Sequence, residues 1–188
     1  NKSIHQHLTD IATDEAVGAH GIVALDWQSG NRSVLVDHEL SGVVLGTTLT
    51  TTAEQIYRAL LEATAYGTRV IVDTFAQSGV PVKEFIVAGG LLKNTFLMQL
   101  YSDVTRLPIS TIDTDQGPAL GSAIHAAVAA GLYSNVNQAA EVMGRVNKHV
   151  YLPNEERSKQ YDGLYKEYLE LHDYFGRGAN NVMKRLKQ

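Results

Sequence analysis

A pair of adjacent glycines near the middle of the chain constrains the fold more than any other feature. Three apolar residues, Phe85–Val87, lead through Ala88 into Gly89 and Gly90, as a buried strand would end in a turn. The segments that follow predict a helix, a second short strand and a second helix, over residues 92–107, 109–112 and 117–131. Alternating strands and helices favour parallel pairing, so the chain is predicted to have an α/β fold.

A long helix is predicted upstream, from Thr50 to Gly79. Its start offers two capping boxes, Thr51 with Glu54 or Thr52 with Gln55. The helix-spaced residues predicted to form its apolar face are Ile56, Leu60, Ala63, Gly67, Ile71 and Phe75. A glycine in mid-helix costs roughly 1 kcal/mol relative to alanine, so Gly67 predicts close packing against a neighbouring element.

The remaining segments are predicted from shorter patterns. Residues 1–20 suggest a helix that leads into the domain, residues 22–27 a strand or extended segment, and residues 28–46 an ordered surface loop with a short extended piece. A short helix follows, capped by Asn135 or Asn137, then an extended piece and a long final helix from Pro153. We divide the chain into a lead-in at 1–20, a domain at 21–175 and a helical tail at 176–188.

Composition excludes several classes of function. The chain of 188 residues has no cysteine, which rules out disulfides and thiolate chemistry and fits a cytoplasmic location. Its formal net charge of -4 argues against nucleic-acid binding, and no apolar run is long enough to suggest a membrane span. The histidines show no metal-binding spacing, so no metal site is predicted. Because the chain begins with Asn1, we expect it to be a piece of a longer protein.

The glycine pair has two interpretations. Bare backbone N–H groups at a strand-to-helix turn can bind an anion such as a phosphate, and glycine lets it come close. A tight turn with no ligand would also need glycine. The pattern matches neither a dinucleotide-binding fingerprint nor a P-loop, so the residues alone leave both interpretations open.

Several separated motifs together resemble a known family. The segments VAGGLLKNTFLMQLYSDVTRLPI and DQGPALGSAIHAAVAAG, with GNRSVLVDHELSGVVLGTTLTTTAEQIYRALLEATAYGTR upstream, are similar to the FGGY carbohydrate kinases, over roughly residues 21–175. The resemblance implies an actin-like ATPase (ribonuclease H-like) fold, of which this chain would be the C-terminal, nucleotide-binding half. A narrower similarity points to the members that phosphorylate L-ribulose. Other members, acting on xylulose or glycerol, and a non-catalytic actin-like module remain alternatives.

The resemblance also implies site residues and cofactors. Gly90 matches the glycine whose backbone contacts the nucleotide phosphates, Asn94 matches a side-chain contact to the nucleotide, and Gly89 would let the turn form. ATP and Mg²⁺ are the implied cofactors. The catalytic aspartate and most sugar contacts would lie upstream of Asn1, so we expect no catalytic residue here and no kinase activity from this chain alone.

Other polar residues are assigned structural roles. Asp113 and Asp115 flank the second glycine cluster, where loop solvation and capping are favoured over a metal or acid/base site. For Asp26 and Asp37, structural roles are favoured over a pair of catalytic carboxylates. Asn31 and Arg32 match the Gly-x-Arg loop of the family, where they would organise the loop, with a role near the cleft as the alternative. The stripe Tyr161, Tyr165 and Tyr168 is predicted to be the core face of the last helix, with a subunit contact as the alternative. The basic end of the chain is predicted to be a frayed helix.

Overall fold

The structure is a computed structural model that describes residues 3–114 and 116–187. Its elements in chain order are α1 (Ile4–Asp14), β1 (Val23–Leu25), β2 (Val43–Leu45), α2 (Ala53–Gln77), β3 (Phe85–Val87), a 3-10 turn (Gly90–Lys93), α3 (Thr95–Thr105), β4 (Ile109–Ile112), α4 (Gly117–Ala129), α5 (Val136–Met143), β5 (Val146–Tyr151), α6 (Glu155–Gly176) and α7 (Val182–Leu186). The predicted α/β class is confirmed. The order of elements agrees with the prediction, except that a 3-10 turn precedes α3 and that the final helical region is divided into α6 and α7.

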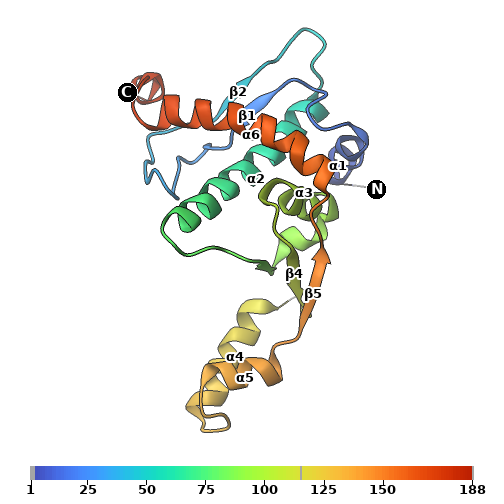
Figure 1. The fold of residues 1–188 in the computed structure, drawn as a ribbon, viewed down its shortest axis with the longest axis vertical. Helices are drawn as coiled ribbons and strands as arrows, with labels where there is room; N and C mark the ends of the chain where they lie inside the picture. Colours follow the sequence, from blue (N-terminus) through green and yellow to red (C-terminus); the bar gives the residue numbers. More distant parts are fainter. Residues whose placement is uncertain (1–2, 115, 188) are drawn as a thin grey trace.

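The three-stranded sheet has the order β3-β4-β5. β3 pairs with β4 in parallel, with Phe85 opposite Ile109 and Val87 opposite Thr111, whereas β5 runs antiparallel to β4. The parallel pairing predicted from the glycine-pair segment is therefore confirmed. A second, two-stranded sheet joins β1 and β2 antiparallel, toward the end of the molecule that lies away from α4 and α5 (Figure 1).

The helix α2 begins with a complete capping box. The Thr52 side chain accepts a hydrogen bond from the Gln55 backbone, and the Gln55 side chain accepts one from the Thr52 backbone. The second of the two predicted boxes is thus the one that forms.

The predicted apolar face of α2 is only partly correct. Ala63 is buried, and Ile56 and Leu60 are partly buried against the core, but Phe75 is exposed. The buried face of α2 consists of Arg58, Ala59, Glu62, Ala63, Ala65, Tyr66 and Val70. Arg58 and Glu62 interrupt the apolar spacing, and they are buried because they pair with each other.

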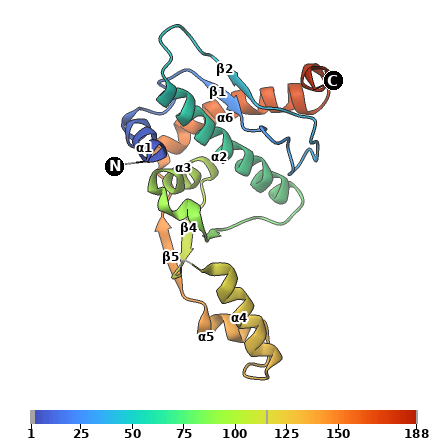
Figure 2. The same cartoon turned by 180° about the vertical axis from the view of Figure 1, so that it is seen from behind.

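The helices α2 and α6 pack together through aromatic side chains. Tyr161, Tyr165 and Tyr168 of α6 are buried, as predicted, and all three surround the buried Tyr66 of α2, with ring centroids 5.4 to 6.4 Å apart. Aromatic pairs at these separations add stability beyond the area that they bury. The tyrosine stripe is core, and α6 crosses α2 behind β1 and β2 (Figure 2).

The helix α7 is packed against the rest of the domain, whereas the prediction was a frayed helix. Met183 of α7 is buried, Lys184 pairs with Asp37 at 2.6 Å, and Lys187 Nζ donates to Leu40 O at 2.9 Å. The polar loop at 37–40 supplies the partners that the local sequence of α7 could not reveal.

The pair α4 and α5 lies beyond the sheet, far from β1 and β2, in both views (Figures 1 and 2). Pro118 stands in the first turn of α4, and Asn135 caps α5, as predicted. Within the described ranges, no helix is long and apolar enough to cross a membrane.

Candidate functional site

The carboxyl ends of β3 and β4 lie at the same edge of the sheet because the two strands run parallel. The chain leaves β3 through Gly89 and Gly90, and it leaves β4 toward α4. A Cβ atom at Gly117, the first residue of α4, would lie 3.3 Å from the Cβ atom of Ala88. The two glycine clusters that the sequence separates are therefore neighbours, at the edge of a parallel pair where α/β folds bind ligands.

The two adjacent glycines have different structural reasons. Gly89 has φ 97° and ψ -167°, a conformation that is essentially confined to glycine. Gly90 has no such need, since its φ is not in the positive region. A Cβ atom at Gly90 would meet no heavy atom of the described residues within 4 Å. The fold explains the glycine at 89 but not the one at 90.

This difference gives a prediction for alanine substitutions. We expect Gly89→Ala to lower the free energy of unfolding by about 1–3 kcal/mol, because it forces a side chain into a glycine-only conformation. Gly90→Ala should leave it unchanged, since both backbone and space accept a methyl group. Urea denaturation of the two variants measures the difference. Equal losses would show that the turn does not have the conformation described.

The segment after the glycine pair departs from the prediction. The predicted helix over 92–107 begins later, because Gly90–Lys93 form a 3-10 turn and α3 starts at Thr95. The Asn94 side chain caps α3 by accepting a hydrogen bond from Leu97 N at 3.0 Å. Asn94 thus has a structural role that was not predicted from the sequence. Its Oδ1 atom is engaged in the cap, so only the remaining hydrogen-bonding capacity of the amide is available to a ligand.

Gly90 and Asn94 line one cavity of about 590 Å³, whereas Gly89 lies outside its lining. The opposite wall comes from α1 and α2: Ser3, His5, Gln6, Thr9, Asp10, Tyr57 and Leu61. Thr9 joins the walls, because its hydroxyl accepts a hydrogen bond from Asn94 Nδ2 at 3.3 Å and bonds to Tyr57 OH at 3.2 Å. The i, i+4 spacing of His5 and Thr9 places them on one helix face, but nothing in the sequence shows what that face meets.

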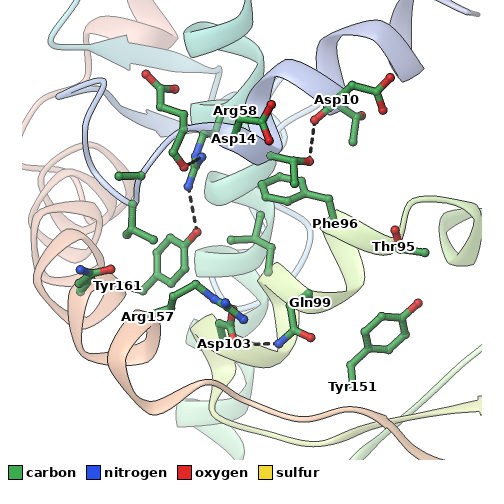
Figure 3. A pocket seen from close by; sticks show the side chains of 17 residues that line it. Asp10, Asp14, Arg58, Thr95, Phe96, Gln99, Asp103, Tyr151, Arg157 and Tyr161 are labelled. Carbon is green, nitrogen blue, oxygen red and sulfur yellow. Dashed lines mark hydrogen bonds and ion pairs between the residues drawn. The ribbon is translucent and has the colours of Figure 1, made fainter.

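A second cavity, of about 850 Å³, lies on the other side of Thr9 and Thr95 between α1, α3 and α6 (Figure 3). Asp103 forms one wall, where it accepts hydrogen bonds from Arg157 Nε at 2.6 Å and Gln99 Nε2 at 2.9 Å. Arg58 reaches across the other end, with its guanidinium 5.6 Å from the ring centroid of Phe96. None of these residues was predicted from the sequence to belong to a site.

Arg58 belongs to a buried charge network that holds α1 in place. Its Nε donates to Glu62 Oε1 at 2.9 Å, and its Nη1 donates to the carbonyls of Ala12, at 2.6 Å, and Glu15. Burial alone would lower the pKa of Arg58, but the hydrogen bond and charge of Glu62 raise it above its ordinary value. The network fixes the C-terminal end of the helix that forms one wall of both cavities.

His20 completes the network and its tautomer follows from geometry. Ile22 N–H donates to His20 Nδ1 at 3.0 Å, so Nδ1 is the acceptor nitrogen. Nε2 therefore carries the proton and donates to Glu62 Oε2 at 3.2 Å. Both carboxylate oxygens of the buried Glu62 are satisfied.

The other singled-out residues are dispersed. Asp37 accepts a hydrogen bond from Lys184, which is the first of several interactions that lower the pKa of Asp37. Asn31 Oδ1 accepts from Leu35 N at 3.3 Å, consistent with the predicted loop-organising role. Asp113 follows β4, and Asp115 lies outside the described residues. Among the described residues, no group of three or more histidine or acidic side chains could hold a metal ion.

The sequence of the chain matches a protein family. Residues 4–130 match the C-terminal domain of the FGGY family of carbohydrate kinases. The chain therefore belongs to the FGGY family of carbohydrate kinases, and its actin-like ATPase fold is the one that the motifs predicted.

Curated relatives narrow the similarity within the family. The chain is 57% identical over 185 residues to a ribulokinase of Mycolicibacterium smegmatis, with 98% of this chain and 33% of the relative covered. It is 51% identical over 191 residues to a ribulokinase of Bacillus licheniformis, with 99% and 34% covered. The chain spans about a third of the length of these relatives.

A solved structure supports the fold. The crystal structure of ligand-bound xylulose kinase from Lactobacillus acidophilus superposes with a TM-score of 0.80, over 89% of this chain and 34% of the other, at 23% sequence identity. At this identity the likeness concerns the fold.

Proposed function

We propose that the intact protein containing this chain is a ribulokinase, which transfers the γ-phosphoryl group of ATP to a primary hydroxyl of L-ribulose. The proposal that this chain binds the nucleotide rests on Gly90. Neither the backbone conformation nor the neighbouring atoms require a glycine at this position. Unlike other such glycines, Gly90 lines a cavity at a strand-to-helix turn, where a ligand that approaches the backbone would give a reason for it. The sequence identity to ribulokinases favours L-ribulose over other sugars.

The proposed roles follow the geometry of the cavity. Gly89 shapes the turn, and the exposed backbone of Gly90 lies where the phosphate chain of the nucleotide would come closest. Asn94 contributes its side chain through the amide hydrogen that it does not give to Thr9. Thr9 holds that amide in a fixed orientation, so the side chain is preorganised before the nucleotide binds.

Phosphoryl transfer depends on positioning and on charge stabilisation from more than one wall of a cleft. We assign the base that accepts the proton of the sugar hydroxyl, and most sugar contacts, to the part of the relatives' length that this chain does not span. Mg²⁺ belongs to the proposal as the partner of the nucleotide phosphates. The described residues offer no set of ligands for it, so we derive no step through it. The absence of cysteine agrees with a cytoplasmic enzyme.

The test is ADP release by the intact protein with L-ribulose, D-ribulose, D-xylulose, L-xylulose and glycerol. We expect the fastest turnover with L-ribulose and none from the 188-residue chain alone. If turnover is fastest with another sugar, the proposed kinase activity stands and L-ribulose is rejected as the substrate. No release with any of these sugars would favour a non-catalytic nucleotide-binding module, and turnover by the isolated chain would show that the base lies within it.

A further inference from the structure

A third cavity, of about 350 Å³, lies between α2 and the loop that follows β1. Its lining shares no residue with the cavity of Gly90 and Asn94. Asp26, Trp27 and Arg32 come from the loop side, whereas Thr64, Gly67 and Thr68 come from the middle of α2. The proposed nucleotide site therefore does not account for it.

The helix wall of this cavity presents hydrogen-bond acceptors. The hydroxyl of Thr64 donates to Leu61 O at 2.7 Å, and that of Thr68 donates to Thr64 O at 3.0 Å. Because each threonine hydroxyl already donates its hydrogen to a backbone carbonyl, its oxygen can only accept a hydrogen bond from a ligand. The carboxylate of Asp26 adds two more acceptor oxygens, and burial raises its pKa. Within the described chain Asp26 has no ion pair with a basic residue.

The absence of a side chain at Gly67 leaves room for polar groups close to the backbone of α2. A Cβ atom at Gly67 would lie 3.3 Å from Tyr168 OH and 3.6 Å from Asp26 Oδ1. Trp27 Nε1 and Tyr168 OH are buried without a hydrogen-bond partner among the described residues. Burial, and then the nearby charge of Asp26, raise the pKa of Tyr168. Unpaired buried polar groups of this kind call for a partner.

The loop side of the cavity is preformed. Asn31 and Asp37 exchange two backbone hydrogen bonds, both 2.8 Å long, and close the loop that carries Arg32 and Ser33. The ion pair between Lys184 and Asp37 at 2.6 Å anchors this loop to α7. A ligand would not have to order the loop, and binding would not incur that cost.

We propose that this cavity binds a small, neutral, polyhydroxylated molecule such as a pentitol or a sugar. The acceptors on Asp26, Thr64 and Thr68 match the donor hydroxyls of such a ligand, and the half-buried Tyr101 offers aromatic surface for its carbon skeleton. The Asp26 carboxylate disfavours an anion, and Arg32 at the exposed rim disfavours a cation. The volume suits a ligand of five or six carbons.

Trp27 provides the readout, because it is the only tryptophan in the chain. In ¹⁵N-labelled protein its indole N–H gives a single identifiable NMR cross-peak, which we would follow while adding ribitol. We expect a saturable shift. Thr68→Val should weaken binding roughly tenfold, the effect of losing one well-placed hydrogen bond. Asp26→Asn should weaken it at least as much.

The matched control is Thr74→Val, since the Thr74 hydroxyl donates to Val70 O at 2.7 Å on the same helix but lies outside the cavity. Thr74→Val and Gly90→Val should both bind ribitol like the parent, which separates this site from the nucleotide site. An indole peak that does not move, a shift that never saturates, or equal binding by Thr68→Val would overturn the proposal. A saturable shift with ammonium chloride but not ribitol would overturn the ligand class.

Discussion

Replacing Gly90 with valine is expected to reduce Mg-ADP binding by at least about a hundredfold, because displaced phosphate groups lose charge-assisted hydrogen bonds to the backbone. The same change should leave the free energy of unfolding nearly unchanged. The backbone at 90 is outside the positive-φ region, and the new side chain would meet no described atom near its Cβ position. Isothermal titration calorimetry with Mg-ADP measures the first effect, and urea denaturation measures the second.

The control for this experiment is Gly163→Val. Gly163 is also exposed, and a Cβ atom there would likewise meet no described atom within 4 Å, but it lies on α6 away from the cavity. It should bind Mg-ADP like the parent chain. Equal binding by the Gly90 and Gly163 variants would remove Gly90 from the nucleotide site and leave its glycine without an explanation.

Sequence reasoning located the strands and helices around the glycine pair because their signals are local. β4 occupies Ile109–Ile112 as predicted, and Gly131, with φ 76°, follows the end of α4. The start of α3 was misjudged for a local reason too. Asn94 is a good helix cap, and a cap at that position ends the 3-10 turn and begins the helix.

The candidate site was only half predictable. Gly90 and Asn94 belong to a motif that the sequence displays, but Thr9 and Tyr57 reach the same cavity from segments that are 48 residues apart. Polar residues at helix spacing are normally read as a solvated face. Whether such a face meets another element depends on tertiary packing, which neither periodicity nor propensity encodes.

The same limitation explains the partly misassigned face of α2. Arg58 and Glu62 stand four residues apart, the spacing of an ordinary exposed ion pair on a helix. Nothing local indicates that the carbonyls of Ala12 and Glu15, the Tyr161 hydroxyl and His20 surround them. Burial follows from partners distant in sequence, so the apolar pattern predicted a face that only partly coincides with the true one.

The buried network leads to the largest stability effect that we expect. Arg58→Met should lower the free energy of unfolding by about 3–5 kcal/mol, because it leaves the Glu62 carboxylate buried beside one neutral histidine. Folded domains are typically stable by only about 5–15 kcal/mol, so this loss is a large fraction of the total. Urea denaturation followed by circular dichroism measures it. Lys159→Met breaks an exposed pair with Glu155 on α6 and should have little effect.

A second variant separates charge from packing. If the stranded carboxylate causes the loss, Arg58→Met combined with Glu62→Leu should be more stable than Arg58→Met alone, since no buried charge remains. Because Arg58 also caps the end of α1 through the carbonyls of Ala12 and Glu15, the double variant should still release α1. α1 carries Thr9, so Mg-ADP binding should stay weakened in both variants. Full recovery of binding in the double variant would show that Thr9 keeps its place without Arg58, and that the network serves stability alone.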